Sequence, residues 1–188
     1  MQNYIKKDED IVRRILQGND SEYSILIDRY KDKGFTLAYR IIKDQFEAED
    51  ILQEAFIKTY NSLGQFKFES KFSTWFYRIV YNTALTFIRS KRQNLNDDST
   101  IIEEMESNVS EYKNIESRDL NVFLGKIILK LPEKYSTIIT LFYINELSYE
   151  EISDLTGNSL SSVKVDLFRA RKLLRDIVLK NNYVKELI

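Results

Sequence analysis

The chain contains no cysteine and no histidine among its 188 residues. Disulfide bonds, the usual zinc-binding frameworks and imidazole acid–base chemistry are therefore excluded. Only five glycines and one proline interrupt regular structure, which favours helices over a fold rich in strands and turns. No apolar run approaches the roughly 18 residues of a membrane span, and the first residues lack a signal-peptide pattern. We expect an all-α, cytoplasmic protein that needs no metal or cofactor.

The net charge of −1 conceals a strong segregation of charge along the chain. Residues 58–92 carry seven basic side chains and one acidic, and residues 161–180 carry six basic and two acidic. Between them, residues 93–113 carry six acidic side chains and one basic, which is typical of a flexible linker. We therefore predict two helical domains, residues 1–92 and 114–188, each with a basic surface, joined by an acidic linker over 93–113.

Residues 148–175 have the pattern of a helix-turn-helix. Ser148 and Glu151 have the spacing of a capping box at a helix start. Gly157 suits the positive φ that ends this first helix, and Ser159 is placed to cap a second one. The second helix of such a unit lies in the major groove of DNA. An ordinary helical hairpin with a solvated basic face is the alternative interpretation.

Apolar spacing predicts three helices in the N-terminal half. The first covers residues 20–43 with a turn near Lys33-Gly34, the second opens at a capping box of Asp44 and Glu47 and runs to about residue 63, and the third runs from Ser73, as N-cap, to about residue 92. Further helices are expected over residues 120–131 and from Pro132 onward. The C-terminal domain is thus expected to have four helices.

Four segments in this order resemble the extracytoplasmic-function (ECF) family of bacterial sigma factors: AEDILQEAFIKTY (48–60), FSTWFYRIVYNTAL (72–85), LPEKYSTIITLFY (131–143), and SYEEISDLTGN with SVKVDLFRARKLLR (148–175). The resemblance implies two helical domains, called region 2 and region 4, in a non-enzymatic protein that directs core RNA polymerase to promoters. It also implies three partners: the core polymerase, through the large-subunit coiled coil and the flap, promoter DNA, and an anti-sigma factor.

The first of these segments is expected to carry the polymerase-binding surface. On the predicted helix from Asp44, helical spacing leaves one face outside the core. An exposed isoleucine ringed by polar groups suits the centre of a protein interface, although a solvated helix face is the alternative. The resemblance implies that this face docks on the polymerase coiled coil. It comprises Asp50, Gln53, Glu54 and Ile57.

The second segment is expected to contact the minus-ten promoter element. The Asn82 amide can both donate to and accept from a base edge. The resemblance implies that Asn82 and a neighbouring loop surround a flipped base, with Phe68 as the stacking ring and Phe66 and Phe72 in the core. Trp75 has a core role or a DNA contact as equal alternatives. The expected minus-ten residues are Lys67, Phe68, Glu69, Ser70, Arg78, Tyr81, Asn82 and Arg89.

The second helix of the helix-turn-helix is expected to read the minus-thirty-five element. Arg169 and Lys164 can each reach guanine, and Phe168 can pack on a thymine methyl group. Arg171 is a phosphate anchor or an internal salt-bridge partner. Asp166 stands where the family usually has arginine, so a known promoter sequence does not transfer. The expected residues are Ser161, Ser162, Lys164, Val165, Asp166, Phe168, Arg169, Arg171 and Lys172.

Two other functions remain open on the sequence. One is a stand-alone helix-turn-helix regulator that binds operator DNA as a dimer. The other is an adaptor that keeps the sigma fold but lacks promoter activity. The sequence disfavours the dimeric regulator, because no separate coiled-coil or ligand-binding domain accompanies the helix-turn-helix.

Overall fold

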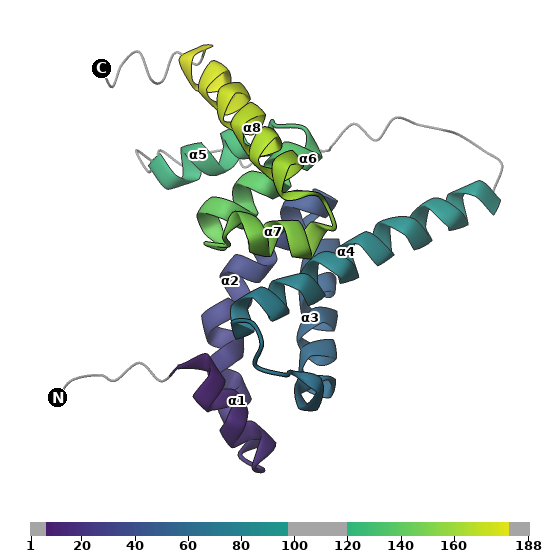
Figure 1. Cartoon of the computed structure of the whole chain (residues 1–188). Coiled ribbons are helices and arrows are strands. Elements are labelled where there is room, and N and C mark those ends of the chain that lie inside the picture. Colours follow the sequence, from purple (N-terminus) through teal and green to yellow (C-terminus); the bar gives the residue numbers. More distant parts are fainter. Residues whose placement is uncertain (1–6, 98–119, 181–188) are drawn as a thin grey trace.

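The computed structural model describes residues 7–97 and 120–180, and every regular element within them is helical (Figure 1). This confirms the all-α prediction. The elements are α1 (Asp8–Leu16), η1 (Asp20–Glu22), α2 (Tyr23–Ile42), α3 (Gln45–Asn61), η2 (Leu63–Gln65), α4 (Phe72–Asp97), α5 (Leu120–Leu129), α6 (Glu133–Ile139), η3 (Thr140–Ile144), α7 (Tyr149–Thr156) and α8 (Leu160–Lys180).

Helices α2, α3 and α4 pack on one another around an aromatic core. The Tyr30 ring centroid lies 5.5 Å from that of Phe72, 5.4 Å from Phe76 and 5.8 Å from Tyr77. Aromatic pairs at this spacing each contribute about 0.5–1.5 kcal/mol beyond the area they bury. Figure 1 shows the C-terminal half of α4 projecting away from this bundle.

The turn expected near Lys33-Gly34 is wrong, because α2 continues through both residues. Gly34 serves packing instead. A Cβ atom there would lie 2.7 Å from Leu52 Cδ1 and 3.2 Å from Phe76 Cε1, so the missing side chain lets α2 approach α3 and α4 closely. In the local sequence, a glycine that allows two helices to cross closely cannot be told from a glycine that ends a helix.

Two predicted helix starts are corrected in detail. The Asp44 side chain caps α3 by accepting from the Glu47 backbone N–H at 2.9 Å, but Glu47 pairs with Lys91 at 2.7 Å, so only half of a capping box forms. Helix α4 begins at Phe72, which puts Ser73 inside its first turn. It runs to Asp97, so the first residues of the predicted 93–113 linker are helical and its remainder lies outside the described residues.

Helix α1 was not expected from the sequence. Its Asp8 carboxylate accepts hydrogen bonds from Arg29 and Tyr30 of α2, which ties α1 to the bundle. Burial raises the pKa of the Tyr30 hydroxyl well above its ordinary value, and the hydrogen bond with Asp8 raises it further. The apolar residues Ile11, Val12 and Ile15 of α1 are buried.

The C-terminal segment from α5 to α8 buries the apolar residues Ile127, Leu131, Ile138, Ile139, Leu141, Ile152, Leu155, Val163, Leu167 and Ala170. All of them except Ile127 belong to one continuous cluster with the buried residues of α1–α4. Pro132 precedes the first helical residue of α6 rather than occupying it. After α6 the chain continues as the π-helical turn η3, and α7 and α8 form the helix-turn-helix.

Candidate nucleic-acid interface

The turn between α7 and α8 has the predicted stereochemistry. The Ser148 backbone N–H donates to Glu151 Oε2 at 2.8 Å, and the Glu151 N–H donates to Ser148 Oγ at 3.1 Å, which completes the capping box. Gly157 has φ 72°, and Ser159 Oγ accepts from the Ser162 N–H at 3.2 Å at the start of α8. Local side chains thus fix the angle at which α8 leaves α7.

The solvent-facing side of α8 is strongly basic. Its Val163 and Leu167 are buried, whereas Phe168 is 68% exposed, which is unusual for a ring without a partner surface. Lys164 Nζ lies 5.9 Å from the Tyr149 ring centroid, which fixes its side chain over α7. The exposed residues of this face are Ser161, Ser162, Lys164, Val165, Phe168, Arg169, Arg171, Lys172 and Arg175.

Among the described residues Arg171 has aromatic partners and forms no salt bridge, which disfavours the internal salt bridge that was one alternative. Its Nε donates to the Tyr143 hydroxyl at 2.8 Å, and its guanidinium carbon lies 5.3 Å from the Phe142 ring centroid. Burial lowers the pKa of Arg171, but hydrogen bonds with Tyr149 and Tyr143 outweigh it and raise the pKa overall. The side chain of Arg171 is therefore held in one orientation by these contacts. The sequence alone did not indicate a role for Tyr143.

The expected place of Asp166 on the groove-facing side of α8 is wrong. Asp166 is only 3% exposed because it faces α6, where its Oδ2 lies 2.8 Å from Lys134 Nζ. Its neighbour Val165 is 45% exposed. At this point of α8 the carboxylate is thus turned away from solvent, and the exposed side chain beside it is apolar.

Helix α4 carries the second group of expected DNA contacts. Arg78, Asn82 and Arg89 are exposed on it, and no side-chain hydrogen bond within the described residues occupies the Asn82 amide. Tyr81 is half-buried, and burial raises the pKa of its hydroxyl. It lines a cavity between α4 and the C-terminal helices together with Asn158.

The loop before α4 presents polar groups but covers its aromatic one. Lys67, Glu69 and Ser70 are exposed. Phe68 is half-buried at φ 59°, with its ring 4.7 Å from Phe66 and beneath the Arg13 guanidinium at 4.9 Å. A stacking role for Phe68 thus requires its ring to leave this contact.

The remaining aromatic residues of this segment belong to the core, as expected for two of them. Phe66 and Phe72 are 5% and 1% exposed, which confirms their predicted place. Trp75 is half-buried with its ring 5.1 Å from Phe66 and 5.9 Å from Phe72, so its contacts favour the core alternative. The packing of Phe72 and Trp75 fixes where the loop joins α4.

The expected polymerase-binding face lies on α3. Asp50, Gln53, Glu54 and Ile57 are all exposed, and Glu54 pairs with Lys58 at 2.7 Å. Ile57, at 56% exposed, is one of the large apolar side chains left in solvent. These four residues therefore form a continuous face with an apolar centre and a charged rim.

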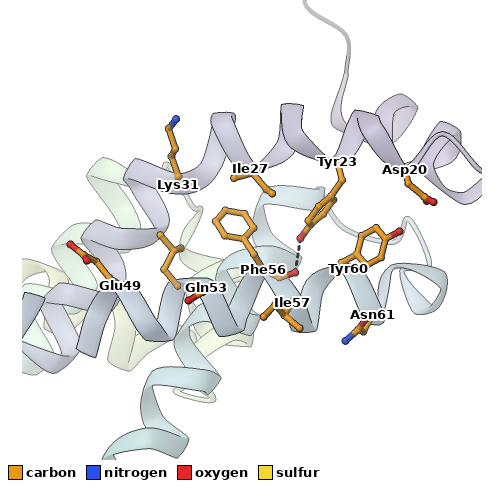
Figure 2. Close-up of a pocket in the computed structure, with 11 residues that line it drawn as sticks. Asp20, Tyr23, Ile27, Lys31, Glu49, Gln53, Phe56, Ile57, Tyr60 and Asn61 are labelled. Atoms are coloured by element: carbon orange, nitrogen blue, oxygen red, sulfur yellow. Dashed lines mark hydrogen bonds between the residues drawn. The ribbon is translucent and has the colours of Figure 1, made fainter. Parts of the chain in front are cut away.

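A mainly apolar groove of about 620 Å³ opens beside this face, between α2 and α3 (Figure 2). The Tyr23 side chain reaches across the groove, and its hydroxyl donates a hydrogen bond to the Phe56 carbonyl at 2.6 Å. Figure 2 shows Gln53 and Ile57 on the α3 side and Ile27 on the α2 side. Leu52 and Phe56 of α3 also line the groove. The sequence did not predict that α2 lines this groove, because its groove residues Tyr23 and Ile27 stand next to its core residues Leu26 and Tyr30 in the same apolar pattern.

No helix among residues 7–97 and 120–180 is long and apolar enough to cross a membrane.

Comparison with known proteins gives matches over both halves of the chain. The Sigma-70 region 2 family matches residues 26–94, and the Sigma-70 region 4 family matches residues 124–174. The ECF RNA polymerase sigma factor SigW of Bacillus subtilis is 35% identical over 173 residues, which are 87% of this chain and 92% of that protein. The ECF RNA polymerase sigma-E factor of Escherichia coli is 34% identical over 176 residues, 89% of this chain and 92% of that protein.

A solved structure shares the fold. The sigma factor RpoE of Bartonella quintana, solved with the anti-sigma factor NepR, aligns with a TM-score of 0.66 at 19% identity, over 85% of this chain and 98% of that one. At this identity the likeness concerns the fold alone.

Proposed function

The chain belongs to the ECF family of RNA polymerase sigma factors, and from this membership we propose that α8 reads the minus-thirty-five promoter element, α4 and its preceding loop read the minus-ten element, and α3 docks on core polymerase. The observation that carries the proposal is the exposed basic face of α8 in a fully capped helix-turn-helix. A stand-alone regulator and an inactive adaptor find no support in these family matches.

Base readout by α8 rests on Lys164 and Arg169, with phosphate contacts from Lys172 and Arg171. A bidentate arginine or lysine contact to guanine contributes about 1–3 kcal/mol of discrimination against other bases. The aromatic contacts of Arg171 fix its position, which suits an anchor that sets the register of the helix in the groove.

Promoter melting requires the polymerase as well as α4. Opening about ten base-pair steps costs on the order of 14 kcal/mol at ~1.4 kcal/mol per step. Capturing an extruded base returns only about 1–3 kcal/mol. Asn82, Lys67, Glu69 and Ser70 thus stabilise a strand that the polymerase has separated. This role assigns no catalytic step to the chain, and it locates the protein in the cytoplasm with the polymerase.

An anti-sigma factor is a further proposed partner. The Bartonella quintana relative was solved with one. The groove between α2 and α3 and the exposed Ile57 offer this chain an apolar surface for such a protein. An inhibitor seated there would compete directly with the polymerase.

In vitro transcription on fragments of the host genome, with core polymerase alone and with this protein added, tests the proposal. Promoter-specific products are expected only when the protein is present. Tight operator binding without core polymerase, or core binding without any product, would contradict it.

One substitution tests the polymerase face. Ile57→Asp places a charge at the apolar centre of the face and is expected to weaken core binding at least tenfold, about 1.4 kcal/mol. Phe46→Asp is the matched control, because Phe46 is 77% exposed on the same helix but does not line the groove. Equal losses in both variants would show that α3 docks through another surface.

A further inference from the structure

Helix α1 packs against the loop that joins η2 to α4, residues 66–71, which we call the minus-ten loop. Figure 1 shows this loop running beside α1. Two charged side chains of α1 reach it: the Arg13 guanidinium carbon lies 4.9 Å from the Phe68 ring centroid, and Glu9 Oε1 accepts from the Phe72 backbone N–H at 3.5 Å. The region 2 family match begins only at residue 26, so it assigns α1 no role.

Phe68 has a backbone conformation that a residue with a bulky side chain rarely adopts. Its φ of 59° lies in the left-handed region, where such a residue persists only if its surroundings hold it there. Two contacts hold the ring: its centroid lies 4.7 Å from that of Phe66, and the Arg13 guanidinium covers it. A cation over the face of an aromatic ring is attracted to it, so Arg13 helps to keep Phe68 in this place.

The covered Phe68 ring determines which side chains the minus-ten loop presents. Its neighbours Lys67, Glu69 and Ser70 are all exposed, whereas Phe66 is buried and Phe68 is half-buried. The two rings thus fix the loop to the helical bundle while the polar groups face solvent. A loop that is already held in its binding conformation loses less conformational entropy when a ligand binds, which raises the affinity.

Arg13 is itself held in place by its own helix. Its Nη1 donates to Asp10 Oδ1, one turn earlier, at 3.0 Å. Helix α1 is in turn attached to α2, because the Asp8 carboxylate accepts from Arg29 and Tyr30. The guanidinium therefore covers the ring from a helix that is fixed to the bundle.

We propose that Arg13 is a positioning residue for recognition of the minus-ten element, and that it acts through Phe68 by holding the minus-ten loop in its binding conformation. The inference rests on the proposed function of this loop, and it makes Phe68 the anchor of the loop in place of a ring that stacks on a base. Loss of a cation–π contact at an exposed site corresponds to about a two- to fivefold change in an equilibrium constant.

Binding of fork-junction DNA to core polymerase carrying this protein measures the effect. The DNA comes from a promoter that the transcription assay yields, with the non-template strand single-stranded across the minus-ten element. Arg13→Ala should weaken binding about two- to fivefold, and Arg13→Lys, which keeps a cation over the ring, should recover most of it. Arg14→Ala is the matched control, because Arg14 is the next residue of α1 and pairs with Glu22 of η1 at 3.2 Å. Its affinity should equal that of the unmodified protein.

A double-mutant cycle shows whether Arg13 acts through Phe68. Phe68→Leu keeps an apolar side chain but removes the ring, so adding Arg13→Ala to it should cause no further loss of affinity. Arg13→Ala should also leave the salt dependence of binding unchanged, because a positioning residue neutralises no phosphate. An equal loss in the Phe68→Leu background, or a weaker salt dependence, would make Arg13 a direct phosphate contact and overturn the proposal. A gain in affinity would overturn it too, because it would mean that the released ring stacks on a base.

The packing of the loop can be measured without DNA through Trp75, the only tryptophan of the chain. Its ring centroid lies 5.1 Å from that of Phe66, which contacts Phe68 on its other side. Arg13→Ala should shift the Trp75 emission to longer wavelength and increase its quenching by acrylamide, whereas Arg14→Ala should do neither.

The two measurements separate a failure of this inference from a failure of the proposed function. Unchanged emission and quenching in Arg13→Ala, or unchanged affinity for the fork-junction DNA, would overturn the role of Arg13 and leave the proposed function intact. Absence of promoter-specific transcription with the unmodified protein would refute the proposed function, and the role of Arg13 in promoter recognition with it.

Discussion

Replacing Arg40 by methionine tests whether a buried cation with no charged partner among residues 7–97 and 120–180 weakens this protein. Arg40 lies where α2 meets α5, and its Nη2 would be 3.7 Å from a Cβ atom at Gly125. Burial lowers the pKa of Arg40, and among the described residues no carboxylate pairs with it. Methionine keeps an unbranched apolar stem and removes the donors.

The expected gain follows from the two unpaired nitrogens. An unsatisfied buried polar group costs about 1–3 kcal/mol, and more when charged, whereas the smaller methionine leaves a gap that offsets part of this gain. We expect Arg40→Met to raise the free energy of unfolding by about 2 kcal/mol. For a chain of this size, that raises Tm by roughly 4–8 °C.

Urea unfolding and calorimetry measure this change, with Arg92→Met as the control. Arg92 is exposed on α4, so its replacement should alter stability by no more than about 0.5 kcal/mol. A loss of stability exceeding 1 kcal/mol would refute the reasoning, since it would mean that Arg40 has an essential partner.

Three other outcomes are expected. Asn82→Ala should reduce open-complex formation, measured by permanganate footprinting, more than core binding; equal losses would make Asn82 structural. Burial raises the pKa of Tyr77 from 10.0 to about 12. Folding therefore gains about 3 kcal/mol of stability from this group below pH 10, and this part is lost as the pH rises to 12. Tyr77→Phe should remove this part of the pH dependence of the free energy of unfolding, measured with urea. Asp166→Asn should lower stability by about 1 kcal/mol through its contact with Lys134 and leave the selected promoter sequence unchanged; an altered sequence at unchanged stability would contradict this.

The helix-turn-helix could be predicted in detail because its determinants are local. Ser148 and Glu151 are three residues apart, and Gly157 and Ser159 act on their own turn, so short-range sequence carries the whole geometry. Apolar spacing likewise predicted the two helices that correspond to α3 and α4.

Features that depend on distant residues could not be predicted. Gly34 has the local pattern of a break, and only the approach of Leu52 and Phe76 makes it a crossing point. Arg171 has its hydroxyl partner 28 residues away at Tyr143, and periodicity contains no information on such pairs. The docking of region 2 on region 4 joins Lys33 to Glu146 across 113 positions, which no local pattern encodes.

The burial of Asp166 removes a carboxylate from the α8 surface that is proposed to contact DNA. A carboxylate on a groove-facing surface would repel phosphates unless it accepted a hydrogen bond from cytosine. With Asp166 turned toward Lys134, that repulsion is absent, and the adjacent position is occupied by Val165. Valine and the exposed Phe168 offer apolar contacts that suit thymine methyl groups. We therefore propose that apolar contacts of Val165 and Phe168 complement the guanine contacts proposed for Lys164 and Arg169.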